Sequence, residues 1–332
     1  MSDYHAKELG PEDLEKWDRF VKSSPQGTLY HTSMWKRYID QSNPGARYGI
    51  FGVFDGAEIL AGCTGLVRKR LGMETLVVPL LTPYTGFLLS PPAGSKVSDT
   101  TSRNESLLQE LAAYLGRFRY QNVSCAPPFC DARPLTCAGY TVAPRYTYEI
   151  DLQIGVDQLL ANMDGHVRRN IKKAQGAGFD LSDQIDVAQA FEIYSHTMTK
   201  NGGTCPVSQF MFDEMANGSG LAEKRRIVAA SKDGRLQSFI ILTHYAGTIS
   251  YTLAATAADA IQSGISSLLV WTALSESVGQ FTTFDFVGAN IPSIARFKAG
   301  FNPALRSFIV AEKTTSTTVK MAKLIKSRLR KG

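Results

Sequence analysis

The chain has 332 residues, enough for two domains of ordinary size, and its 44% hydrophobic and 20% charged residues are typical of a folded globular protein. The net charge of +6 comes from the last segment, which contributes six cations: Lys320, Lys323, Lys326, Arg328, Arg330 and Lys331. Without these six, 30 of the 36 basic residues remain against 30 acidic ones, so the body of the chain lacks the broad basic surface expected for binding a large polyanion.

In the first half, the hydrophobic pattern predicts two helices, a hairpin, and then a strand, a helix and two extended segments. Pro11 suits the start of the first helix, either Thr32 or Ser33 can cap the second, and Asp55-Gly56 is a hairpin turn signal. The expected elements are helices over 11–21 and from 33, a hairpin over 47–60, a strand over 76–80, a helix over 102–119, and extended segments near 123 and over 146–152.

The second half repeats this order, beginning with a helix that Asp164 can cap. Turns at Asp233-Gly234 and Ala246-Gly247 separate three strands. The expected elements are helices over 164–174, 187–200 and 210–216, strands over 226–230, 236–243 and 248–255, a helix over 266–277 and a strand over 283–286. The repetition predicts a tandem duplication of one α/β unit, with domains over 1–150 and 151–311 and a tail over 312–332.

Targeting and redox features predict a cytoplasmic protein. Residues 1–17 are polar and acidic, so no secretory signal is visible, and the long uncharged stretches contain prolines or many polar residues, unlike a membrane span. Five cysteines, an odd number without a C-x-x-C pair, favour free thiols over disulfides. We expect no metal site.

The segment near residue 290 combines a half-buried strand, Phe284-Asp285-Phe286, with a turn at Gly288 and a helix that carries Phe297-Lys298 and leads to Phe301. This F-D-F-x-G strand followed by F-K-x-x-F resembles the terminal signature of the FemABX-like branch of the GNAT acyltransferases. In the second half the similarity also covers 168–174 with Gly178 and 264–271, and weaker similarity in the first half covers 30–35 and 83–86. The resemblance implies an α/β (α+β mixed sheet) fold of two tandem GNAT-like domains, with the active cleft in the second domain or at the junction.

Two residues of this segment are candidates for catalysis. Lys298 could place its ammonium at the strand exit, where it would stabilise negative charge on a carbonyl oxygen. In FemABX aminoacyltransferases the matching lysine lies at the donor carbonyl, so the resemblance implies that role; the alternative is a surface lysine. Asp285 could take the amine proton, or it could simply bond a neighbouring backbone group or Arg296.

The turn between the strand over 248–255 and the next helix is the candidate donor site. Gln262, Gly264, Ser266 and Ser267 could expose backbone N–H groups at a helix N-terminus, which suits a pyrophosphate. GNAT enzymes carry a Q/R-x-x-G-x-G/A loop here, to which this segment is a degenerate match. An ordinary strand-to-helix turn with a serine cap is the alternative.

Four cations on one helix, Arg168, Arg169, Lys172 and Lys173, could bind phosphates of an acceptor or a donor, or form a solvated face. Tyr251 and Phe297 are further candidates for substrate binding. The tail could be a basic amphipathic helix that binds the inner membrane surface or RNA. Alternatively, its apolar residues could pack on the first domain.

The predicted activity is transfer of an acyl group from acyl-CoA to an amine of a small-molecule, sugar or cell-envelope precursor, including lipid-linked acceptors. One alternative is an aminoacyl-tRNA-dependent aminoacyltransferase that acts on a peptidoglycan precursor, for which tRNA would be the partner. The neutral body favours acyl-CoA over tRNA. The other alternative is a GNAT-fold binding protein that has lost turnover.

Overall fold

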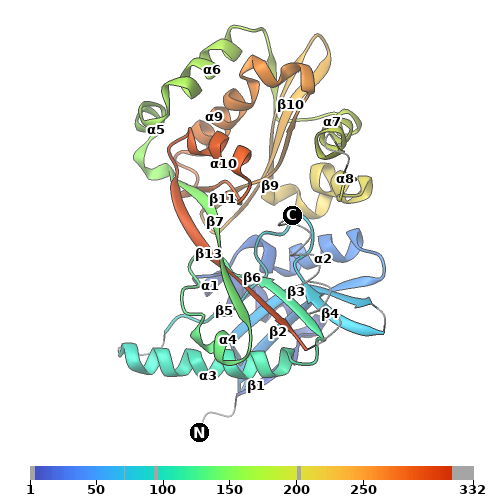
Figure 1. Cartoon of the computed structure of the whole chain (residues 1–332), viewed down its shortest axis with the longest axis vertical. Helices are drawn as coiled ribbons and strands as arrows, with labels where there is room; N and C mark the ends of the chain where they lie inside the picture. Colours follow the sequence, from blue (N-terminus) through green and yellow to red (C-terminus); the bar gives the residue numbers. More distant parts are fainter. Residues whose placement is uncertain (1–3, 71, 93–95, 200–202, 316–332) are drawn as a thin grey trace, which may run out of the picture. The chain divides into compact units, whose positions relative to one another are not determined.

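The computed structural model describes residues 4–70, 72–92, 96–199 and 203–315, and these fall into two compact units (Figure 1). Among these described residues, the first unit combines those up to residue 145 with residues 307–315, and the second comprises those from 146 to 306. In the part of the chain so described, no helix is long and apolar enough to cross a bilayer.

The first unit is a mixed sheet with helices. Its strands are β1 (His5–Glu8), β2 (Ala46–Asp55), β3 (Glu58–Arg70), β4 (Met73–Val77), β5 (Leu88–Leu89), β6 (Tyr120–Ser124) and most of β13 (Ala304–Thr314). Its helices are α1 (Leu14–Ser23), α2 (Ser33–Ser42), α3 (Val97–Leu115) and α4 (Arg133–Cys137), with 3-10 turns at Pro11–Asp13 and Leu29–His31. The strand order is β1-β2-β3-β4-β6-β13, parallel only between β4 and β6, and β5 pairs with β3.

The second unit repeats this plan. Its strands are the end of β7 (Thr141–Asp151), β8 (Asp180–Ser182), β9 (Arg225–Lys232), β10 (Arg235–Tyr245), β11 (Thr248–Thr256) and β12 (Thr283–Asp285). Its helices are α5 (Val156–Asn162), α6 (Gly165–Gln175), α7 (Val187–Thr199), α8 (Gln209–Asn217), α9 (Ile265–Ser277) and α10 (Pro292–Ala299), with 3-10 turns at Leu152–Ile154, Ser219–Lys224 and Ala258–Ser263. The order β8-β9-β10-β11-β12-β7 is parallel only between β11 and β12. The predicted mixed α/β fold with two tandem units is therefore confirmed.

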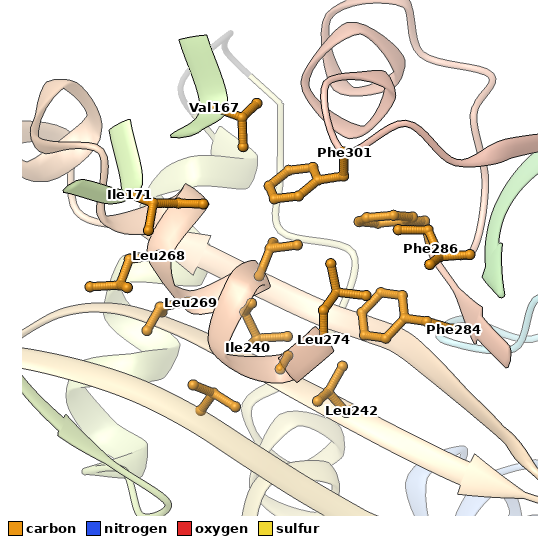
Figure 2. Close-up of a cluster of buried hydrophobic side chains, with 14 of the residues drawn as sticks. Val167, Ile171, Ile240, Leu242, Leu268, Leu269, Leu274, Phe284, Phe286 and Phe301 are labelled. Carbon is orange, nitrogen blue, oxygen red and sulfur yellow. The ribbon is translucent and has the colours of Figure 1, made fainter. Parts of the chain in front are cut away.

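The core of the second unit lies between its sheet and the helices α6 and α9 (Figure 2). Val167 and Ile171 of α6 and Leu268 of α9 face strand residues such as Phe284, and all four side chains are buried. Burying each large apolar side chain stabilises the fold by about 1.5–3 kcal/mol. The opposite face of the sheet packs against α7 and α8, where the rings of Phe212 and Phe239 lie 5.9 Å apart.

Local sequence signals account for most element boundaries. The Thr32 side chain caps α2 by accepting from the N–H of Trp35, and Asp233 and Gly234 both adopt positive φ in the predicted hairpin turn. Asp164 occupies the N-cap of α6 as predicted, yet its side chain makes no capping hydrogen bond. Strand β4 ends at Val77, not at residue 80, because the chain reaches Pro79, which lacks the N–H that a ladder needs.

The unit boundary differs from the predicted domains because strands are exchanged between the two halves of the sequence. Strand β13, which the sequence reasoning missed, pairs with β6 of the first unit through residues 310–314. Residues 307–311, predicted to belong to the second domain, therefore belong to the first unit. The end of β7, directly after the first half, pairs with β12 of the second unit. The predicted tail helix over 319–331 lies outside the described residues.

His31 gives the first unit a pH-dependent stability. The imidazole is buried, and burial lowers its pKa to about 3. The unfolded chain binds this proton below about pH 6.5 and the folded chain does not, so stability falls as the pH decreases through that window. Between pH 7 and 5 we expect the wild type to lose roughly 2 kcal/mol more unfolding free energy than His31→Gln, measured by urea titration. An equal loss in both proteins would contradict this assignment.

Candidate active site in the second unit

The strands β11 and β12 form a fork. They pair in parallel over only three residues each, Thr248–Ser250 beside Thr283–Asp285. Strand β11 continues to Thr256, whereas β12 ends at Asp285 and the chain turns away. Among the described residues, the backbone over 251–256 therefore pairs only with β10. Unpaired strand groups at the carboxyl end of a parallel pair are a frequent place for ligands.

The turn after β12 is strained and closely held. Val287 adopts a φ of 53°, which is rare and costly for a β-branched residue. Its N–H donates to Oδ1 of Asp285 at 2.8 Å, and the N–H of Gly288 donates to Oγ1 of Thr147 at 3.0 Å. The Thr147 hydroxyl in turn donates to Asp285 Oδ1 at 2.6 Å. A strained backbone that is fixed by several side chains is typical of functional sites.

Lys298 binds the other side of the same turn. Its Nζ donates to the carbonyl oxygens of Phe286 at 2.7 Å and of Gly288 at 2.8 Å, and it lies 5.5 Å from the ring centroid of Tyr251. The side chain is only 5% exposed. Burial lowers the pKa of Lys298 to about 8, and the nearby charge of Asp285 opposes this effect. A third, longer hydrogen bond joins Nζ to the carbonyl oxygen of Val287 at 3.5 Å, so the ammonium is a buried, fixed charge at the fork.

The turn from β11 into α9 approaches α6 closely. Gly264 adopts a φ of 87°, and a Cβ at this position would lie 2.4 Å from the carbonyl oxygen of Asn170, so only glycine fits. The N–H of Ile265 is capped by the Ser263 hydroxyl at 3.1 Å. Lys173 of α6 donates to the carbonyl oxygen of Gln262 at 2.7 Å. An ammonium therefore lies beside the positive end of α9, an arrangement that favours an anion.

Comparison with known protein families agrees with this geometry. Residues 161–299 match the sequence model of the acetyltransferase (GNAT) domain family. This match lies wholly within the second unit. No curated protein sequence matches the chain significantly.

Solved structures show the same fold along nearly the whole chain. FemX is 13% identical with a TM-score of 0.64, covering 92% of this chain and 96% of FemX. The C-terminal domain of a putative lysylphosphatidylglycerol synthetase from Agrobacterium fabrum is 12% identical with a TM-score of 0.56, and the match covers 94% of this chain and 95% of that domain. A tandem GNAT protein from the clavulanic acid biosynthesis pathway is 12% identical with a TM-score of 0.53, and the match covers 95% of this chain and 100% of that protein. The fold that the FemABX-like resemblance implied is thereby confirmed.

In the GNAT domain, Asp285 mainly holds the turn. It is 4% exposed, and its Oδ1 accepts from Thr147 and Val287. Directly across the antiparallel pair, Glu149 of β7 is in register with Asp285. Burial raises the pKa of Glu149, and the negative charge of Asp285 raises it further. Arg306, whose Nε lies 3.3 Å from Oε2 of Glu149, opposes both effects. Sequence reasoning missed Glu149, because only the register of β7 on β12 brings it beside residue 285.

The predicted donor-site residues gather at the start of α9, but in different roles. The Ser266 hydroxyl is 2.8 Å from that of Thr256, and Ser267 is buried. Gln262 is exposed and holds Lys173 through its carbonyl oxygen. The GNAT domain therefore offers backbone groups at this turn rather than a cluster of side chains. Sequence reasoning included Lys173 in a basic patch but did not connect it to the turn.

The predicted acceptor residues divide between two places. Tyr251 lies beside Lys298, and burial raises its pKa. Phe297 packs on Phe301 with ring centroids 5.5 Å apart, next to the same cluster. Arg168 instead caps α5, donating to the carbonyl oxygens of Ala161 at 2.9 Å and of Met163. Arg169 is exposed on α6. The structure thus brings Tyr251 and Phe297 to the fork and uses Arg168 to join α5 to α6.

A cavity of about 840 Å³ lies at strand β9 of the second unit. Arg225, Arg226 and Leu242 line it, and Leu242 pairs in register with Tyr251. The Arg226 guanidinium lies 5.1 Å from the ring centroid of Phe281 and bonds the side-chain oxygen of Gln280. Within the described ranges, neither arginine forms an ion pair with a carboxylate.

Proposed function

We propose that this protein is an N-acyltransferase that transfers an acyl group from acyl-CoA to an amine of a small-molecule, sugar or cell-envelope precursor. The observation that supports the proposal is that two features lie together at the carboxyl ends of β11 and β12. The turn at Gly264 offers an anion site, and the fork between β11 and β12 begins at Ser250 with Lys298 beside it. Both follow the carboxyl ends of parallel strands, so one extended donor could reach from one to the other.

The donor pyrophosphate would bind at the N-terminus of α9. The first turn of a helix carries partial positive charge, and the close approach of Gly264 to the Asn170 carbonyl oxygen fixes the start of α9 against α6. Lys173 adds a fixed positive charge. The pantetheine arm would then lie along the part of β11 over 251–256, where its amides could complete the unpaired strand edge.

The thioester carbonyl would lie near Lys298. Attack by an amine turns this carbonyl oxygen into an oxyanion, which a preorganised ammonium stabilises strongly in a dry site. Lys298 is already held by two backbone carbonyls, so little reorganisation is required when charge develops. Tyr251, whose ring lies beside the ammonium, would narrow the fork around the reacting carbon.

The two arginines of the cavity at β9, which Asp183 and Glu276 also line, would bind an acceptor that carries phosphate or carboxylate groups. Arg225 is anchored by donating to the carbonyl oxygens of Met215 at 3.3 Å and Gly218 at 3.0 Å, and Arg226 is stacked on Phe281. Guanidinium groups fixed in this way bind oxyanions with little loss of side-chain entropy. Phosphorylated sugars and lipid-linked precursors present such groups next to an amine.

The donor is tested by a matched pair of lysine variants. Lys173→Met removes the charge at the turn and should weaken CoA binding about tenfold, an effect that decreases as salt is added. Lys172→Met removes an exposed lysine of the same helix and should leave affinity unchanged. Isothermal titration calorimetry with CoA and acetyl-CoA measures both. Absence of CoA binding by the wild type, together with amino-acid transfer from charged tRNA, would replace the proposal by the tRNA-dependent alternative.

A further inference from the structure

Two carboxyl groups of the second unit face each other at the base of the fork. Glu149 of β7 is directly opposite Asp285 of β12 in the antiparallel register, so their Cβ atoms lie about 4.5–5.5 Å apart. Thr147, two residues before Glu149, points to the same face and bonds Asp285. The adjacent residues Ile150 and Phe284 point to the other face and lie in the core.

The two carboxylates differ in what surrounds them. Asp285 is 4% exposed and already accepts two hydrogen bonds, whereas the Glu149 side chain keeps 23% of its surface exposed. The charged groups that act on Glu149, among the described residues, are Asp285 on β12 and Arg306 on β13. Burial and the Asp285 charge raise the pKa of Glu149, and Arg306 opposes them. Lys298 is the charged neighbour of Asp285 on the far side of the turn.

We propose that Glu149 is the base that accepts the proton of the attacking amine. This role rests on the proposed acyl transfer, for which the amine must lose one proton as its nitrogen bonds to the thioester carbon. The C–N bond forms, the C–S bond breaks, the amine proton passes to the Glu149 carboxylate, and the CoA thiolate leaves and takes a proton from solvent. Both carboxylates face away from the α6 and α9 core, on the opposite face of the sheet.

Proximity to the fork supports this assignment. Strands β11 and β12 separate directly after the Ser250 and Asp285 pair, and Glu149 lies one strand beyond Asp285 in the same row. Glu149 can therefore reach an amine in the fork while Asp285 continues to hold the turn. A base whose proton affinity is raised toward neutral pH is better suited to this step than an ordinary surface carboxylate.

The pH dependence of kcat/KM tests the proposal with acetyl-CoA and an amine that the wild type acylates. In Glu149→Gln, kcat/KM should fall on the order of 100-fold, and its decrease at acid pH should disappear from the profile. Glu149→Asp should keep part of the rate. Arg306→Met removes the one opposing cation, so the acid limb should move to higher pH. Arg235→Met, an exposed arginine on β10, should leave the limb in place.

Carbon-13 NMR of the Glu149 carboxyl gives a readout that does not need turnover. Glu149 should titrate above the usual glutamate range, and further upward in Arg306→Met; a titration at or below that range would overturn the proposal. Wild-type turnover that persists unchanged in Glu149→Gln would overturn the role of Glu149 alone. No turnover by the wild type with any acyl-CoA or aminoacyl-tRNA would overturn the proposed function, and this role with it.

Discussion

Replacement of Lys298 by methionine is expected to lower kcat on the order of 100-fold, because the thioester oxyanion loses its fixed positive charge. The variant should also lose stability. Two carbonyl oxygens, of Phe286 and Gly288, lose their donor, and an unpaired buried polar group costs about 1–3 kcal/mol. Activity should therefore be measured well below the melting temperature of the variant.

The control is Lys232→Met. Lys232 also donates to a backbone carbonyl, that of Ala177 at 2.9 Å, but it is exposed and far along β9 from the fork. This variant should keep full kcat. Equal activity of the wild type and Lys298→Met would show that Lys298 serves only to fasten α10 to the turn.

Activity and stability should respond to alkaline pH in opposite directions. Since the Lys298 pKa is lowered to about 8, the ammonium is lost above that pH, and kcat should fall. Between about pH 8 and 10.5 the unfolded chain binds this proton and the folded chain does not, so the Lys298 contribution to stability rises by roughly 3 kcal/mol. A pH series of kcat and of urea unfolding, with Lys298→Met as reference, measures both.

Replacement of Gly264 by alanine should abolish CoA binding and destabilise the second unit by about 2–4 kcal/mol. The added Cβ would meet the Asn170 carbonyl oxygen at 2.4 Å, and the φ of 87° is strained for any L side chain. α6 or α9 must then move, and the N-terminal amides lose their arrangement.

Gly279→Ala separates the two causes. Gly279 has a φ of 78° and no heavy atom within 4 Å of an added Cβ, so its variant reports backbone strain alone. We expect a loss of about 1 kcal/mol with unchanged CoA affinity. Thermal unfolding and calorimetry of both variants make the comparison. If Gly264→Ala and Gly279→Ala lose the same stability and keep the same CoA affinity, the close approach of α6 to Gly264 contributes to neither.

The sequence predicted the parts of the fold that depend on local chemistry. The hairpin at Asp55-Gly56, the cap at Thr32 and the position of Lys298 after β12 all follow from residues within a few positions of each other. Similar signals occur in both halves, so the tandem arrangement could be predicted from the sequence. The family resemblance came from the same local pattern around residues 284–301.

The unpredicted features depend on contacts between distant segments. Glu149 meets Asp285 across 136 positions, the difference of their numbers, through strand register alone. Arg168 was a candidate either for binding phosphates or for a solvated helix face, yet its Nη1 donates to carbonyl oxygens at the end of α5. Strand β13 was missed because polar and charged residues interrupt its apolar pattern, and its pairing with β6 spans almost 200 positions.

The exchange of β7 and β13 has a consequence for biosynthesis. During translation the first unit must wait for its last strand, because β6 gains its β13 neighbour only after residue 314 leaves the ribosome. Until then β6 presents an open edge that invites pairing with other chains. A fragment that stops near residue 300 would carry the whole GNAT match over 161–299 and still leave that edge uncovered. Expression of either half alone should therefore yield aggregates, and the second unit should be studied in the complete chain.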